Sequence, residues 1–170
     1  MILENIHCLL QFDDRGNLLA LVSKSSGRNY IVKDGCSLFR LTMTEIIENR
    51  VMPGTLALTG DMAEQIDFIQ QSQCLEIDYR NLDGMPVTVK CTIGFMDEEI
   101  HWNILIENKT RFAVSEIEYP VLLFKPYLGL NAESERILLP KMDGILLGNP
   151  ELHPWQPARE LDRLPVHRHG

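Results

Sequence analysis

The strongest pattern in this chain lies in residues 75–121, where apolar and polar residues alternate in runs joined by short polar turns. In the middle run the apolar side chains stand at every second position: Ile100, Trp102, Ile104 and Ile106. On a helix these four residues would spread over more than half of the circumference, whereas a strand places all of them on one face. The pattern therefore predicts a β-strand.

The runs on either side alternate in the same way. The preceding run has Val87, Val89, Cys91, Ile93 and Phe95 on one side. The following run alternates until Pro120. Proline has no N–H for a β-ladder, so we expect this last strand to lie at an edge of its sheet or to bulge there. The connecting turns, such as Asp83-Gly84 and Asn108-Lys109-Thr110, suit antiparallel hairpins. The stretch is therefore predicted to be a meander whose strands pair in sequence order.

Weaker alternation in the N-terminal part predicts further strands. Residues 6–12 and 18–22 are expected to form a hairpin around the polar turn at 13–17. Shorter strands are expected at 30–32 and 39–43.

The next segment leaves two alternatives. Residues 45–50 fit either a strand or a single helical turn, and we favour the strand because the neighbouring residues alternate. In either case Met52-Pro53-Gly54 is predicted to end the element.

These elements together predict an all-β fold, an antiparallel β-sandwich. Turns recur about every 8 to 12 residues and no amphipathic helix interrupts them, which disfavours alternating strands and helices. Beyond Phe124 prolines recur, and short strands are expected only at 136–139 and 145–147. We assign residues 1–149 to the sandwich domain. Residues 150–170 are an irregular tail that either wraps the sandwich or links it to a missing C-terminal module, and we favour a fragment of a longer protein.

Length and charge narrow the classes of function. A chain of 170 residues suits one domain that buries roughly 70% of its unfolded surface. A net charge of −8 opposes binding to nucleic acid or to an anionic membrane, both of which need clustered Lys and Arg. The N-terminus does not resemble a secretion signal, and no apolar run approaches the ~18 residues that cross a bilayer. We expect a soluble chain whose cellular location is unknown.

The cysteines do not indicate a metal centre. Cys8, Cys36, Cys74 and Cys91 show no CxxC spacing and have no nearby histidine pairs. We therefore expect no metal site and no cofactor. Cys8 and Cys91 fall on apolar faces of predicted strands, where a cysteine acts as a small buried hydrophobe.

Several segments resemble the N-terminal β-sandwich that precedes the catalytic barrel of many glycoside hydrolases, a domain of the galactose-mutarotase-like (supersandwich) type. The first hairpin, with its Gly turn, is similar to the first hairpin of that family. The segment that ends it is Ser25-Ser26-Gly27-Arg28-Asn29-Tyr30, which also resembles the family. Two later segments also resemble it: residues 102–122, with Asn108-Lys109-Thr110 and Tyr119-Pro120, and residues 138–150, with Pro140, Gly144, Gly148 and Pro150.

This resemblance implies a non-catalytic N-terminal domain that supports the cleft of a following catalytic module in the same protein. The acids of a glycosidase would belong to that module, so we assign no catalytic residue here, and whether the parent protein is an enzyme stays open. One alternative is a stand-alone carbohydrate-binding module. Another is an aldose-epimerase-like enzyme that relies on His7 and His101.

Sugar binding commonly needs an aromatic ring on which a sugar can stack, with polar groups at its rim. Trp155 is the candidate ring, and His153, Asp143 and Lys141 are the candidate polar groups for binding carbohydrate. The alternative, which we favour, is that Trp155 fastens the tail to the sandwich. Trp102 lies on an apolar face and is predicted to belong to the core. Asn108-Lys109-Thr110 matches the glycosylation pattern, but in a tight hairpin its Asn is expected to serve the turn.

Overall fold

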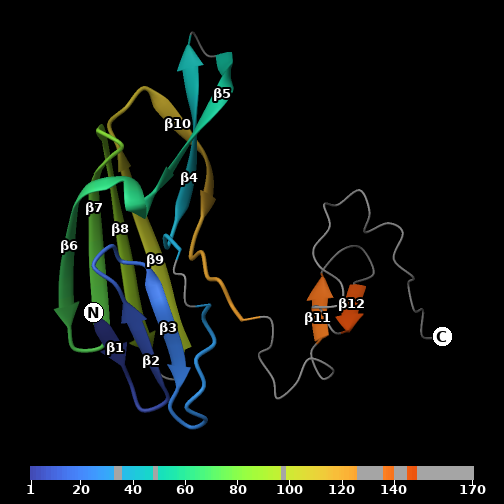
Figure 1. Ribbon diagram of the computed structural model, residues 1–170. Helices are drawn as coiled ribbons and strands as arrows, with labels where there is room; N and C mark the ends of the chain where they lie inside the picture. The colour runs from blue at the N-terminus through green and yellow to red at the C-terminus, as the bar shows by residue number, and fades with distance from the viewer. Residues whose placement is uncertain (33–35, 48–49, 97–98, 126–135, 140–144, 149–170) are drawn as a thin grey trace. The chain divides into compact units, whose positions relative to one another are not determined.

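The computed structural model in Figure 1 describes residues 1–32, 36–47, 50–96, 99–125, 136–139 and 145–148. The chain divides into two compact units, 1–123 and 124–170, and each is described by itself. The elements of the first unit are β1 (Ile2–Glu4), β2 (Cys8–Phe12), β3 (Leu18–Ser23), β4 (Arg40–Ile47), β5 (Arg50–Thr59), the 3-10 turn η1 (Gly60–Met62), β6 (Ala63–Gln71), β7 (Cys74–Leu82), β8 (Met85–Met96), β9 (Glu99–Asn108) and β10 (Phe112–Glu118). The second unit contains β11 (Arg136–Leu139) and β12 (Ile145–Gly148).

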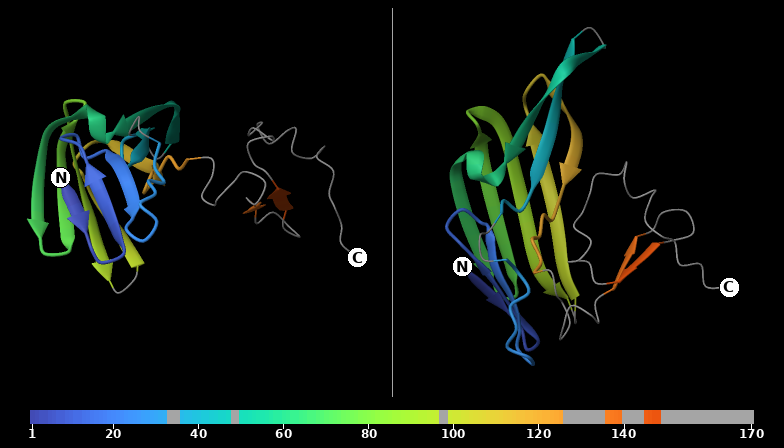
Figure 2. Two further views of the ribbon diagram at one scale, coloured as in Figure 1. Left: turned by 60° about the horizontal axis from the view of Figure 1, so that its bottom comes forward. Right: turned by 45° about the vertical axis from the view of Figure 1, so that its right-hand side comes forward.

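The strands of the first unit form antiparallel sheets, in the orders β1-β2-β3, β10-β4-β5 and β6-β7-β8-β9. The β1–β3 sheet lies over one face of the β6–β9 sheet in the views of Figures 1 and 2. This arrangement confirms the all-β antiparallel fold and is consistent with a sandwich.

The core is formed by the apolar residues of the alternating runs, which point inward from their strands. Leu75, Ile77 and Tyr79 of β7 lie opposite Ile93, Cys91 and Val89 of β8, and all are buried. Residues from the other two sheets pack into the same cluster: Leu3, Leu10, Phe12, Leu18, Leu41, Met43 and Leu58. Trp102, predicted to belong to the core, is only partly buried: it packs against this cluster and stands edge-to-face with Tyr119 at 6.5 Å between ring centroids.

The predicted meander is confirmed for β7, β8 and β9 but wrong for the strand that follows. β10 pairs with β4 in another sheet. The turn between β9 and β10 is closed by side chains: the Asn108 amide nitrogen donates to the Phe112 carbonyl oxygen at 2.6 Å, and Thr110 N–H donates to the Asn108 amide oxygen at 3.0 Å. Asn108 therefore serves the turn, as expected, but this turn does not require its two strands to pair.

The expectation for the strand before Pro120 is confirmed. β10 is an edge strand, ends at Glu118, and shifts register between Val114 and Glu116. Inward side chains of β10, Phe112 and Val114, pack against the core. The chain therefore leaves the β6–β9 sheet because another sheet lets these apolar residues be buried.

The β4–β5 hairpin differs from expectation in one respect. The favoured strand at 45–47 is confirmed, but β5 runs through 52–54, where the element was predicted to end. Thr44 pairs with Thr55 and Ile46 pairs with Val51, so the three residues 52–54 stand opposite a single residue of β4. Such a bulge accepts a proline because the ladder is interrupted there.

Three short predicted strands have different outcomes. Residues 30–32 are not a strand, although the Tyr30 N–H donates to Leu21 O at 2.9 Å and the Val32 N–H donates to Leu123 O at 2.8 Å. Residues 136–139 and 145–147 were predicted as strands, and β11 and β12 pair there as an antiparallel hairpin, which confirms them. The predicted tail, 150–170, lies outside the described residues.

Tyr79 joins the central sheet to the rest of the core. It is only 1% exposed, stands edge-to-face with Phe39 at 5.1 Å, and its hydroxyl donates to the Gly16 carbonyl oxygen at 3.3 Å. Gly16 has a φ of +77°, and a Cβ added there would lie 2.1 Å from the Tyr79 hydroxyl oxygen. Position 16 therefore requires glycine for two reasons: its backbone is left-handed, and Tyr79 leaves no room for a Cβ.

We expect Gly16→Ala to destabilise the fold more than Gly27→Ala. Gly27 also has a positive φ, +66°, but nothing lies within 4 Å of an added Cβ. Both changes carry a left-handed backbone penalty of about 1–2 kcal/mol. Gly16→Ala adds overpacking against Tyr79, of about 1–3 kcal/mol. Urea unfolding of both variants measures this difference, and equal losses would contradict the contact between the turn and Tyr79.

Burial of Cys91 predicts a loss of stability at alkaline pH. Desolvation raises the pKa of the Cys91 thiol from 9.0 to about 12 in the folded chain. Above pH 9 the unfolded chain therefore loses this proton before the folded chain does, and stability falls as the pH rises from 9.0 to about 12.

We expect the unfolding free energy to fall by about 1 kcal/mol between about pH 8.5 and 10 through this group alone. Cys91→Val keeps the volume similar and removes the titrating thiol, so its unfolding free energy should fall less over the same interval. Urea unfolding at both pH values tests this. The same pH dependence in both proteins would show that Cys91 is not buried as described.

Candidate functional site

The outward side chains of β6, β7, β8 and β9 form ordered rows across the sheet. One row across all four strands is Asp67, Asp78, Lys90 and Leu105, and the next is Gln65, Arg80, Thr88 and Glu107. Both rows follow from alternation: when Ile77 and Tyr79 point inward, Asp78 and Arg80 must point outward. The register then places opposite and like charges beside one another.

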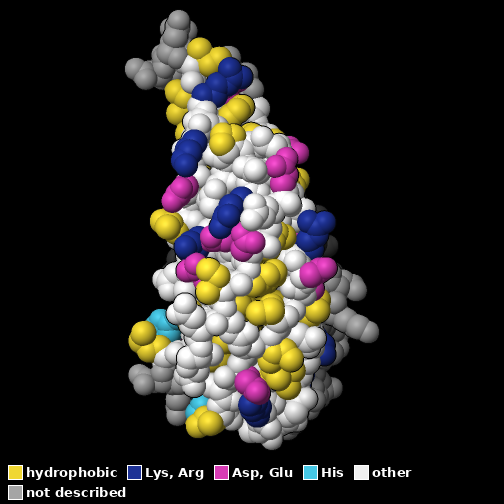
Figure 3. All heavy atoms as spheres, turned by 90° about the vertical axis from the view of Figure 1, so that its left-hand side faces the viewer, with side chains coloured by type: hydrophobic (Ala, Val, Ile, Leu, Met, Phe, Trp, Pro, Cys, Tyr) yellow, Lys and Arg dark blue, Asp and Glu magenta, His cyan; other side chains and the backbone are white. Residues whose placement is uncertain are grey.

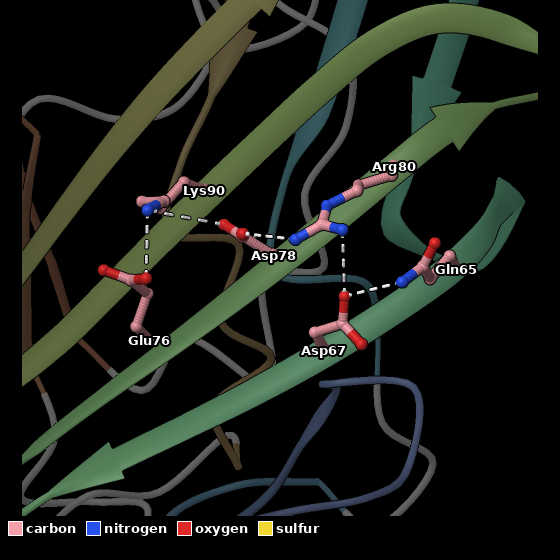
Figure 4. Close-up of polar contacts among 6 residues, drawn as sticks. All are labelled: Gln65, Asp67, Glu76, Asp78, Arg80 and Lys90. Atoms are coloured by element: carbon pink, nitrogen blue, oxygen red, sulfur yellow. Dashed lines mark hydrogen bonds and ion pairs between the residues drawn. The ribbon is translucent and has the colours of Figure 1, made fainter.

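An ion-pair network connects the two rows (Figure 4). Arg80 reaches Asp67 at 3.3 Å and Asp78 at 3.1 Å, so one guanidinium bridges two carboxylates that face each other across strands. Lys90 contacts Glu76 at 2.9 Å and lies 3.8 Å from the second oxygen of Asp78. Without Arg80, the directly opposed carboxylates of Asp67 and Asp78 would repel each other.

Asp78 differs from its charged neighbours in its burial. It is 9% exposed, and among the described residues it is the charged one that counts as buried. Its Oδ2 accepts a hydrogen bond from Arg80, but its buried Oδ1 has no hydrogen-bond partner. A buried acceptor without a hydrogen bond carries a desolvation cost of about 1–3 kcal/mol.

A hollow of about 240 Å³ lies over these residues. Its lining consists of Asp78, Arg80, Thr88, Lys90, Leu105 and Glu107. Lys90 is held protonated here, because its hydrogen bond with Glu76, and then the charge of Asp78, raise the pKa of its ammonium. Figure 3 views the molecule from the side on which β6 lies and shows acidic and basic side chains next to one another there.

The structure does not test the carbohydrate residues predicted from sequence. Lys141, Asp143, His153 and Trp155 all lie outside the described residues.

The two histidines of the epimerase alternative lie on different elements, His7 in the turn before β2 and His101 on β9. His7 immediately precedes β2 of the β1–β3 sheet, and its N–H donates to the Asn5 side-chain oxygen at 2.8 Å. His101 lies on the outer side of β9, with its Nε2 3.4 Å from a Glu99 carboxylate oxygen. The structure therefore gives no support to a shared role for them.

The acidic turn at Asp13-Asp14 has a structural role. The Asp13 carboxylate accepts hydrogen bonds from the N–H groups of Arg15 and Asn17, at 2.9 and 2.8 Å. These bonds shape the loop that brings Gly16 to Tyr79.

The sequence pattern alone does not single out the six residues around the hollow. A signal existed, since Asp78, Arg80, Lys90 and Glu107 all stand at polar positions of alternating runs. That signal predicts exposure, but only the strand register shows that these residues are neighbours.

No family model matches the chain, and no curated protein is significantly similar to it. Among the described residues, no group of three or more His, Cys, Asp or Glu side chains is placed to hold a metal ion. In the same part of the chain no helix has the length and apolar character needed to cross a membrane.

We expect Arg80→Met to lower the unfolding free energy by about 1–2 kcal/mol, because it leaves the partly buried carboxylates of Asp67 and Asp78 facing each other. Lys109→Met is the matched control: its ion pair with Glu107, at 4.0 Å, is exposed, and its loss should cost less than about 0.5 kcal/mol. Urea unfolding at neutral pH measures both. Equal effects would mean that the network is no stronger than an ordinary surface ion pair.

Proposed function

We propose that this chain is a non-catalytic β-sandwich domain of a glycoside-hydrolase-like, carbohydrate-active protein, and that it supports the fold and cleft of a C-terminal catalytic module. The carbohydrate part of this proposal rests on the resemblance of residues 3–30 and 102–122 to the galactose-mutarotase-like (supersandwich) domain. The antiparallel layers are compatible with that domain type.

The observation that carries the supporting role is the free end of the β4–β5 hairpin. β10 pairs with β4 only from Arg40 to Glu45, whereas Ile46 and Ile47 pair only with β5. The hairpin therefore extends beyond β10, as Figures 1 and 2 show. Apolar side chains are visible on this projecting end in Figure 3.

Ile46 and Ile47 are 42% and 45% exposed. Neither isoleucine belongs to the hydrophobic core cluster, and as neighbours on one strand they point to opposite faces of the hairpin. Fully burying a side chain of this size stabilises by about 1.5–3 kcal/mol. We propose that a neighbouring module of the same protein covers these two side chains, because a supporting domain needs apolar residues whose burial stabilises the contact between the two modules.

Two serine substitutions at the hairpin, Ile46→Ser and Ile47→Ser, test this in the protein encoded by the whole reading frame. In the 170-residue chain alone we expect the double variant to change the unfolding free energy by less than about 1 kcal/mol, since both residues are exposed. In the longer protein we expect the catalytic module to lose about 2 kcal/mol of stability, measured by calorimetry, and its hydrolysis of aryl glycosides to fall.

Ile69→Ser is the matched control, because Ile69 is 47% exposed on β6, away from the hairpin. It should leave the catalytic module unchanged. The proposal fails if the hairpin variant melts and hydrolyses glycosides like the control, or if the reading frame encodes no further module.

A further inference from the structure

Strand β9 forms a long edge of the central sheet. It ends the order β6-β7-β8-β9, so no described strand pairs with its other side. It spans Glu99–Asn108, contains no proline or glycine, and its register with β8 continues without a bulge. Short length, prolines and bulges are devices that commonly protect an edge strand from pairing with another chain. β9 has none of the three.

The backbone hydrogen bonds show which groups of β9 face this edge. The N–H of Lys109, the residue after β9, donates to the Pro86 carbonyl oxygen of β8 at 3.1 Å. In an antiparallel pair, successive residues direct their backbone groups to alternate sides, so the odd-numbered residues of β9 face β8. Four residues therefore direct their N–H and C=O groups to the edge: Ile100, Trp102, Ile104 and Ile106. The Tyr119 hydroxyl donates to the carbonyl oxygen of Asn103, an odd-numbered residue, and does not satisfy these groups.

The apolar side chains along the edge are incompletely buried. Three residues of β8 on the inner face are fully buried: Val89, Cys91 and Ile93. The residues of β9 that pair with them are only partly buried: Ile106, Ile104 and Trp102. A strand added at this edge would bond to the backbone of β9 and cover more of these side chains.

The charges of β9 match those of a second, antiparallel copy of the same strand. With a two-fold axis at Ile104, Glu99 faces Lys109 of the second copy, and His101 faces Glu107 of the second copy. Symmetry repeats both contacts on the other side of the axis. On the inner face, Trp102 faces Ile106 of the second copy, a pair of an aromatic and a β-branched residue of the kind that stabilises sheets.

The alternative register does not have this match. With the axis at Asn103, Glu99 would face Glu107 of the second copy, and like charges directly opposite each other are destabilising. The other edge of the sheet does not have it either. β6 carries the acidic Glu64 and Asp67 but no Lys or Arg, so two copies of β6 gain no attractive charge pair in any register.

We propose that two copies of this chain associate through β9, antiparallel about a two-fold axis at Ile104, so that their β6–β9 sheets join into one. A contact limited to one strand from each copy is small for a protein interface, and we expect a Kd of about 100 µM. This dimer goes beyond the supporting role and depends neither on the β4–β5 hairpin nor on a catalytic module.

Sedimentation equilibrium and hydrogen exchange of the 170-residue chain test the proposal. Between about 10 and 1,000 µM the chain should change from mostly monomer to mostly dimer. Over this range, exchange of the four edge amides, those of Ile100, Trp102, Ile104 and Ile106, should slow about fivefold. Exchange of the His101, Asn103 and Leu105 amides, which already donate to β8, should not depend on concentration.

Charge reversal tests the register. Lys109→Glu and Glu99→Lys should each weaken association about tenfold, because each places like charges opposite each other twice in the dimer. The double variant restores opposite charges, so its Kd should return to within about threefold of that of the unchanged chain. Glu99 and Lys109 are 81% and 76% exposed, so the fold should tolerate these changes.

Lys24→Glu and Glu4→Lys are the matched controls. They change the net charge by the same amounts, and their ion pair joins β1 to the residue after β3, on another sheet. Both should leave the Kd unchanged.

Four results would overturn the proposal. The first is a chain that stays monomeric at about 1,000 µM. The second is a dimer whose four edge amides exchange as fast as in the monomer, and the third is a double charge reversal that does not restore association. The fourth is protection of the four edge amides at every concentration, which would show that a segment of the same chain pairs with β9. Failure of the hairpin experiment, by contrast, would leave this dimer unaffected.

Discussion

The register between β7 and β8 is the constraint on which both faces of the central sheet depend. Pairing Tyr79 with Val89 and Ile77 with Cys91 puts four apolar side chains into the core. A slip of one residue would turn the apolar side chains of one of these strands to the other face. The free energy of burying these side chains therefore selects one register, and that register also fixes the outer face.

The charged outer face is a consequence of this packing. Asp78 stands directly opposite Lys90 because their neighbours on each strand are buried together. Arg80, two residues further along β7, then lies within reach of both Asp67 and Asp78. The hollow is thus carried by a sheet whose inner face is buried, and Asp78 Oδ1 is shielded from solvent there without a hydrogen bond of its own.

Side chains in the turns connect this sheet to the others. Asp13 shapes the loop that presents the Gly16 carbonyl to Tyr79, and Asn108 closes the turn after β9. The role of Asn108 was predictable, because Asn in a tight turn bonds to backbone nearby. The contact between Gly16 and Tyr79 was not, because 63 residues separate them and no local pattern joins them.

The sequence by itself determined most of the strands and which face of each is apolar, since side-chain alternation is a local property that burial selects. It failed at residues 30–32, which form no strand, and at 52–54, where β5 continues through a bulge. It did not determine the partner of β10, because Phe112 and Val114 could be buried in more than one sheet. It also could not bring Asp78, Arg80, Thr88, Lys90 and Glu107 together around one hollow. Only the tertiary structure decided both, because strand pairing is set by burial of the whole apolar surface at once.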